Sequence, residues 1–93
     1  MRTKEFCVED YLRTDEEIAA YLSAALEEND PSFFNIALGD VARARGMSAV
    51  AERAGVGRES LYKSLSKDGN PQFGTIVDVL GALGFKLTIA PSS

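Results

Sequence analysis

The sequence contains no histidine, no tryptophan and a single cysteine, Cys7, among its 93 residues. Histidine is the side chain that most often serves as a general base near neutral pH, so Cys7 has no partner that could activate it as a nucleophile. We therefore interpret Cys7 as a packed or idle thiol. One cysteine cannot form a disulfide within the chain, which fits a cytoplasmic location.

Long apolar runs are missing as well. No stretch approaches the roughly 20 apolar residues of a membrane helix, and the charged first residues lack the apolar segment of a secretory signal. The sequence also has no metal-ligand cluster, no phosphate-binding glycine loop and no arranged pair of acid and base. These absences predict a protein that is not an enzyme, needs no metal or cofactor and has no membrane partner.

What is present is typical of one globular domain, with 45% hydrophobic and 26% charged residues. The charges are sorted along the chain: residues 1–40 hold ten acids and three bases, a net −7, whereas residues 41–70 hold six bases and three acids, a net +3. Because cellular salt screens charge over about 8 Å, the basic middle matters more to a polyanion than the total of −4. The acidic front is either a solvated helix or a docking surface for a basic protein partner.

Residues 47–66 predict two short helices joined by a glycine turn, which is a helix-turn-helix and points to DNA. Ala51 is small where the first helix must touch the second. Gly55 allows the positive φ that a tight turn needs, and Val56 buries the turn.

The second helix of this motif has one apolar and one polar face. Leu61 and Leu65 are four residues apart and are expected to point inward, while Gly57 is a weak N-cap. The outward side chains, which are the candidates for DNA contact, are Arg58, Glu59, Tyr62, Lys63 and Ser66.

Two N-cap motifs predict the helices that precede this motif. Thr14, followed three residues later by Glu17, forms a capping box, so we expect an acidic helix over residues 14–29. Asp30 and Pro31 fit an N-cap and a first-turn proline, which predicts a second helix. The expected buried stripes are Ile18, Tyr21, Leu22, Ala25 and Leu26 in the first helix and Phe34, Ala37, Leu38, Val41 and Ala42 in the second.

The carboxyl-terminal part predicts one helix and one strand. Asn70 and Pro71 repeat the pattern of cap and first-turn proline, and the helix is expected to end at Gly84. Its expected buried residues are Phe73, Ile76, Val77, Leu80 and Leu83. Apolar and polar residues alternate over residues 85–89, which predicts a short strand that needs the amino-terminal arm, a second subunit or another protein as its partner.

These residues resemble a known family over nearly the whole chain. Residues 32–83 are similar to the λ-repressor/Cro-type (XRE) helix-turn-helix domain, and the fuller pattern resembles small antitoxins called addiction-module antidote proteins. The matching features are the Tyr11-Leu12 pair before the Thr14-capped helix, the run from Ala37 to Ser48, the run from Arg58 to Lys63, the Gly69-Asn70-Pro71 turn and the final strand. Gly57 is a departure, because serine is usual there.

The resemblance implies a mainly α fold, a five-helix λ-repressor-like helix-turn-helix domain with a short C-terminal β-strand. Within one domain we expect an arm at residues 1–13, the acidic helix, a DNA-binding core at 30–84, and a strand with tail at 85–93. The resemblance also implies that the protein neutralises a cognate basic toxin of the RelE/HigB-like ribonuclease class and represses their shared operon.

Each candidate side chain has a physical role on double-stranded operator DNA. Arg58 can donate two hydrogen bonds to guanine, and Glu59 can accept one from cytosine or orient Arg58. Tyr62 can contact a thymine methyl group or a phosphate. The phosphate-contacting candidates are Lys63, Lys67 and the Ser48 hydroxyl, with Ser66 as the trailing position of the helix. The alternative for each is an ordinary exposed residue.

One such domain covers few bases, so we expect a homodimer on a near-palindromic operator. The dimer surface is either the last helix with the strand or the amino-terminal arm. Three hypotheses remain open: an antitoxin whose residues Glu5 to Asp30 contact a toxin, a stand-alone phage-type repressor without a toxin, and a protein-interaction adaptor that never meets DNA.

Overall fold

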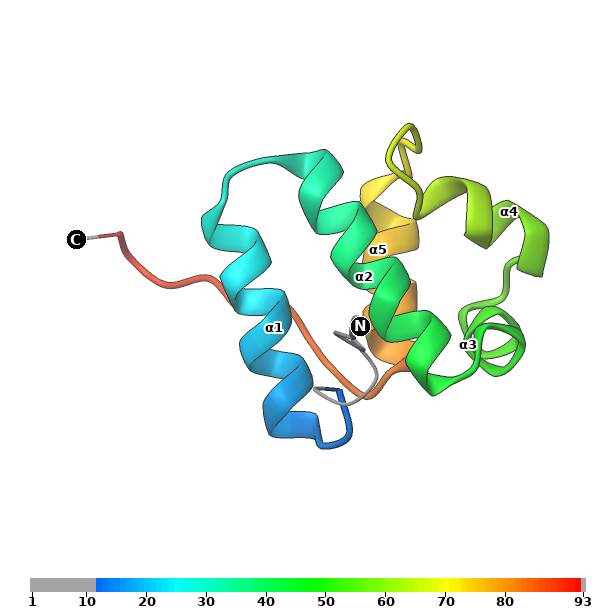
Figure 1. Ribbon diagram of the computed structural model, residues 1–93, viewed down its shortest axis with the longest axis horizontal. Coiled ribbons are helices and arrows are strands. Elements are labelled where there is room, and N and C mark those ends of the chain that lie inside the picture. Colours follow the sequence, from blue (N-terminus) through cyan, green and yellow to red (C-terminus); the bar gives the residue numbers. More distant parts are fainter. Residues whose placement is uncertain (1–11, 93) are drawn as a thin grey trace, which may run out of the picture.

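A computed structural model describes residues 12–92, which form five helices and no strand (Figure 1). The helices are α1 (Asp15–Glu27), α2 (Pro31–Arg45), α3 (Met47–Ala54), α4 (Arg58–Ser64) and α5 (Phe73–Ala82). The predicted mainly helical fold is therefore confirmed for this part of the chain. The amino-terminal arm, apart from its last two residues, lies outside the described residues, and so does Cys7.

The first two helices begin where their cap motifs predict. The Thr14 hydroxyl accepts a hydrogen bond from the Glu17 amide at 3.1 Å, and the Glu17 carboxylate accepts one from the Thr14 amide at 3.1 Å. The Asp30 carboxylate accepts a hydrogen bond from the Ser32 amide at 3.0 Å, with Pro31 as the first residue of α2. Both caps satisfy amides that the helix itself leaves without partners.

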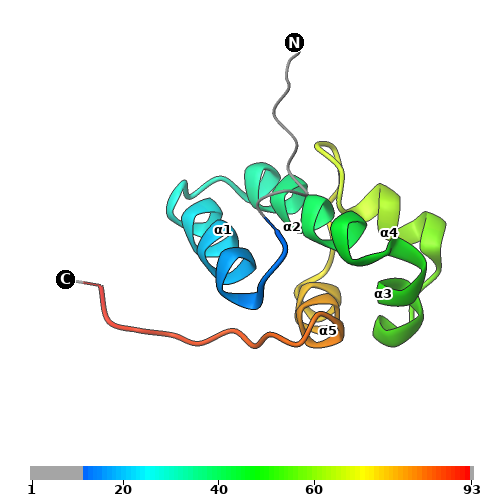
Figure 2. The ribbon, with the colours of Figure 1, turned by 60° about the horizontal axis from the view of Figure 1, so that its bottom comes forward.

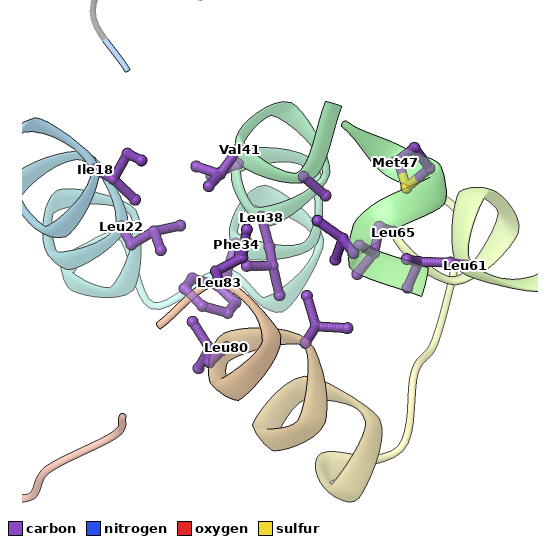
Figure 3. Close-up of a cluster of buried hydrophobic side chains, with 14 of the residues drawn as sticks. Ile18, Leu22, Phe34, Leu38, Val41, Met47, Leu61, Leu65, Leu80 and Leu83 are labelled. Atoms are coloured by element: carbon purple, nitrogen blue, oxygen red, sulfur yellow. The ribbon is translucent and has the colours of Figure 1, made fainter. Parts of the chain in front are cut away.

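The helices pack around one hydrophobic core (Figure 3). Helix α1 packs on α2, and α3 packs on both α2 and α5. The centre of the core comes from α2, whose Leu38 and Val41 have no exposed surface, and α1 contributes Ile18, which is also fully buried. Figures 1 and 2 place α1 and α4 on opposite sides of the pair formed by α2 and α5.

Three residues expected in buried stripes are instead exposed. Leu26 is 49% exposed, Phe73 is 73% exposed and Val77 is 43% exposed, so these expectations were wrong. Helix α5 turns Val79, Leu80 and Leu83 into the core, which rotates its buried face away from Phe73 and Val77. Leu26 lies near the end of α1, beyond the Ala25 contact with the core.

The start of α5 was also predicted too early. Residues 69–72 form no regular secondary structure, and the N-cap is Gln72 rather than Asn70, with no side-chain hydrogen bond to the helix. The end of α5 agrees better with the prediction. Gly84 has φ of 90°, and the Phe85 amide donates a hydrogen bond to the Leu80 carbonyl at 2.8 Å, which terminates the helix.

The predicted strand at residues 85–89 is absent from the described residues, and that expectation was wrong. An extended segment becomes a strand only when a second backbone offers it a ladder of hydrogen bonds, and residues 12–84 provide no such partner. The segment runs away from α5 past α1 in both views, and Ile89 is 99% exposed (Figure 2). No described helix is long and apolar enough to cross a membrane.

Candidate functional site

The turn between α3 and α4 has the geometry that its sequence predicts. Gly55 adopts a left-handed conformation with φ of 76°, and its amide donates to the Glu52 carbonyl at 3.2 Å. The next amide, that of Val56, donates to the Ala51 carbonyl at 3.0 Å, while Ala51 itself is buried. These two bonds close the end of α3 and direct the chain into α4.

Helix α4 is held by its inward leucines. Leu61 is 1% exposed and Leu65 is 2% exposed, and both belong to the core cluster (Figure 3). A β-carbon built on Gly39 of α2 would lie 2.7 Å from the Leu65 carbonyl oxygen. Real β-carbons do not come this close to a backbone oxygen, so only glycine lets the end of α4 approach α2 in this way.

A second contact secures the chain beyond α4. Asn35 of α2 is 7% exposed, and its side-chain amide donates a hydrogen bond to the Gly69 carbonyl at 3.1 Å. Sequence reasoning missed both Asn35 and Gly39. The signal was a polar residue and a glycine inside an otherwise apolar helical stripe, where each residue type is unfavourable unless a neighbour requires it.

The outward face of α4 is exposed and polar, as the sequence predicts. Arg58, Glu59 and Lys63 are exposed, and Tyr62 is 38% exposed. The Arg58 guanidinium lies 5.5 Å from the centre of the Tyr62 ring, a cation–π distance that brings these two side chains together on one face. Gly57 is the N-cap of α4 and makes no side-chain cap bond.

The remaining candidates flank this face. Ser66 and Lys67 follow α4 and are exposed, and the Ser66 hydroxyl donates to the Lys63 carbonyl at 2.7 Å. That hydroxyl oxygen can still accept a hydrogen bond but no longer offers its proton freely. Ser48 is the second residue of α3 and is exposed, beside helix-start amides that no side chain caps.

Two arginines of α2 are engaged with carboxylates. Arg43 forms an ion pair with Asp40, and Arg45 forms one with Asp15 at 3.0 Å between Nη2 and Oδ1. Asp40 also accepts a hydrogen bond from the Tyr21 hydroxyl at 2.9 Å. Burial, together with the hydrogen bond to Asp40 and its negative charge, raises the pKa of Tyr21 to about 12. This network joins α1 to α2 through the Tyr21–Asp40 hydrogen bond and the Arg45–Asp15 ion pair.

The described residues contain no group of three Cys, Asp or Glu side chains that could hold a metal ion. The site formed by α3 and α4 is therefore an exposed surface of hydrogen-bond donors and acceptors on a buried apolar support.

The chain is similar to known proteins that identify its family. A model of the family described as "Probable addiction module antidote protein" matches residues 2–91. The chain belongs to this family. A protein of Haemophilus influenzae strain Rd, described as uncharacterized, is 45% identical over 89 residues, which span 96% of this chain and 92% of the relative. No solved structure matches. Membership of an antidote family supports an antitoxin role and implies a cognate toxin as partner.

Proposed function

We propose that this protein is the antitoxin of a type II toxin–antitoxin module, which binds and neutralises a RelE/HigB-like toxin and represses its own operon. The DNA-binding part of this proposal rests on the amphipathic character of α4, in which two leucines are buried below a polar, partly cationic outward face. The toxin-binding part of the proposal rests on the family match.

On operator DNA, α4 lies in the major groove. Arg58 donates to guanine O6 and N7, and Glu59 accepts from cytosine N4 or orients Arg58. Tyr62 contacts a thymine methyl group or a phosphate, and it also supports the Arg58 guanidinium through the stacking described above. The residues that contact phosphate are Ser48, Lys63 and Lys67, and Ser66 is the trailing position of the helix. Two copies related by a two-fold axis place their α4 helices about 34 Å apart on an inverted repeat.

The DNA half is tested by comparing Arg58→Ala with Lys63→Ala on DNA from upstream of the protein's own gene. We expect Arg58→Ala to relax the base preference at one position, with a loss of about 1–3 kcal/mol on the preferred sequence. Lys63→Ala should weaken binding to all DNA sequences alike. It should also reduce the slope of the logarithm of the binding constant against the logarithm of salt concentration by about one.

Arg53→Ala is the matched control for these substitutions. Arg53 is an exposed arginine of α3 that lines a depression with Ala82 and Leu83 of α5 and its end, and it is not among the residues proposed to contact DNA. The Arg53→Ala substitution removes the same charge as the other two and should leave the base preference of the protein unchanged. Equal affinity of all three variants and the unsubstituted chain for every DNA would contradict the DNA assignment and favour the adaptor hypothesis.

The toxin half is tested by expressing the protein of the adjacent reading frame alone and together with this chain. We expect growth arrest in the first case and rescue in the second. A neighbour without toxicity, combined with retained DNA binding, would favour a stand-alone phage-type repressor. Light scattering over a concentration range tests the homodimer, and a strict monomer that binds single half-sites would contradict it.

A further inference from the structure

An apolar groove lies between α1, α2 and α5, and Asn70 and Pro71 of the connection from α4 to α5 also line it. It has a volume of about 450 Å³ and runs between the connection of α1 to α2, the start of α5 and the carboxyl-terminal segment. Its lining includes Leu26, Phe34, Phe73, Ile76 and Leu87. Three of these side chains remain 40% exposed or more in this structure, namely Leu26, Phe73 and Leu87. A cluster of partly exposed large apolar residues around a groove is typical of a protein-binding surface.

The groove is bordered by negative charge. Residues 14–42 contain seven acids and neither lysine nor arginine. Asp30 is the acidic residue that lines the groove, and the exposed Glu27 and Glu28 lie close to it in the chain without lining it. Neither Glu27 nor Glu28 takes part in an ion pair among residues 12–92. This border attracts a cationic partner and repels the phosphates of DNA.

The charge also argues against a second copy of this chain in the groove. Two grooves facing each other across a two-fold axis would place the acidic residues of both copies, Glu27, Glu28 and Asp30, in or beside one interface. Like charges placed opposite one another across an interface oppose association. A protein segment with apolar side chains flanked by lysine or arginine would complement both the apolar lining of the groove and the acidic residues near it.

We propose that this groove is the docking site for the toxin, and that it receives an apolar segment of the toxin flanked by basic residues. The inference rests on the proposed antitoxin function and names the surface that performs it. Phe73 and Leu26 supply the apolar contact, and Glu27, Glu28 and Asp30 supply the complementary charge. None of the outward residues of α4 lines the groove, so the toxin and the DNA contact different residues of this chain.

The test uses the full chain and the purified protein of the adjacent reading frame as the probe, with affinity measured by calorimetry. Phe73→Asp should weaken binding at least tenfold, because docking would bury a carboxylate without a partner. The double variant Glu27→Lys with Glu28→Lys should weaken binding by a similar factor, and this loss should shrink as salt is raised. All three positions are exposed, so circular dichroism and the melting temperature should stay close to those of the unsubstituted chain.

Each variant has a matched control outside the groove. Val77→Asp adds the same charge at an exposed apolar residue one turn along α5, and Val77 does not line the groove. Glu52→Lys with Asp78→Lys makes the same change in net charge at two exposed positions elsewhere. Both controls should bind the probe as the unsubstituted chain does.

The outcomes separate this inference from the function on which it rests. If the unsubstituted chain binds and rescues growth but Phe73→Asp binds equally well, the groove assignment is wrong and the antitoxin function stands. If the unsubstituted chain binds no adjacent-frame protein, both fall. If Phe73→Asp instead halves the mass in solution while toxin binding persists, a second copy occupies the groove and the inference is overturned.

Discussion

At the scale of single residues, the position of α4 depends on a missing side chain. Gly39 lies inside α2, where glycine destabilises a helix relative to alanine. It is tolerated there because the Leu65 carbonyl occupies the space in which a β-carbon would lie. The gain from bringing the two backbones together exceeds the loss in helix propensity, and the buried leucines of α4 fit only at this separation.

We predict that Gly39→Ala lowers the free energy of unfolding by about 1–3 kcal/mol, because a rigid backbone oxygen must move to admit the methyl group. Urea denaturation of both proteins would measure the difference. Gly81→Ala is the control, since a β-carbon at this helical glycine meets nothing within 4 Å. It should raise stability by up to about 1 kcal/mol through helix propensity alone. A neutral Gly39→Ala would contradict the close approach.

Tyr21 gives the protein a dependence on alkaline pH. Its pKa is raised from 10.0 in the unfolded chain to about 12 in the folded protein by burial and by the hydrogen bond to Asp40. The contribution of the Tyr21 hydroxyl to the free energy of unfolding is fully present below pH 10 and is lost as pH rises toward 12. Unfolding releases the proton in that window, so the folded state is increasingly disfavoured.

We therefore predict that Tyr21→Phe loses stability less steeply than the unsubstituted chain between pH 10 and pH 12. Melting temperatures measured across this range would show the difference. The two proteins differ only in the Tyr21 hydroxyl, so the comparison isolates its contribution. Parallel curves would mean that the Tyr21 hydroxyl is not held against Asp40.

At the scale of elements, the helix starts show which local signals suffice. The Thr14 capping box and the Asp30-Pro31 pair lie where they were expected, because each cap needs only residues within four positions of itself. The predictions that failed depend on distant parts of the chain. Asn70, for example, resembles a cap, yet α5 begins only after Gln72, and the Gly69 carbonyl before Asn70 is held by the Asn35 side chain of α2.

The outward face of α4 could be predicted from the sequence because Leu61 and Leu65 fix its orientation by their spacing alone. The groove could not, because Leu26 and Phe73 come together only through the packing of α1, α2 and α5. Their periodicity predicted burial for both. A periodic pattern of apolar residues does not distinguish a side chain buried in the core of the chain from one that stays exposed beside a groove.

Gly57 is the weakest helix start next to the proposed DNA surface. It has extended backbone angles, φ −71° and ψ 143°, that suit a capping side chain, and an added β-carbon would meet only the Ser60 hydroxyl, at 3.8 Å. We predict that Gly57→Ser raises the free energy of unfolding by about 0.5–1 kcal/mol through the cap bond and lower entropy of the unfolded chain. Thermal unfolding would measure it.

Gly57→Ala separates the two contributions, since alanine restricts the unfolded chain but cannot accept a hydrogen bond from the α4 amides. The serine variant should therefore be more stable than the alanine variant. If the two melt at the same temperature, capping adds nothing at this helix.

At the scale of the whole molecule, two surfaces of different charge use different residues. Helices α3 and α4 belong to the basic middle of the sequence, while the groove is lined by residues of the acidic α1, of α2 and of α5 and by none of the outward residues of α4. Partners on these surfaces do not compete for the same atoms. The two proposed activities are therefore geometrically compatible within one copy of the chain.

We predict that the adjacent-frame protein and operator DNA bind simultaneously. In a gel-shift experiment, adding that protein to the DNA complex should produce a more slowly migrating band, whereas Phe73→Asp should show the DNA shift without the second one. Release of free DNA on addition of the partner would show that the two surfaces compete.

The separation of inner and outer faces on α4 has a consequence for how such proteins diverge. Leu61 and Leu65 carry the packing of the helix, whereas Arg58, Glu59, Tyr62 and Lys63 make no part of the core. Substitutions at the outer positions can accumulate without loss of folding. Under the proposed function, duplicated genes can thus drift to new operators while keeping the same scaffold, and modules in one genome can become insulated from each other's promoters.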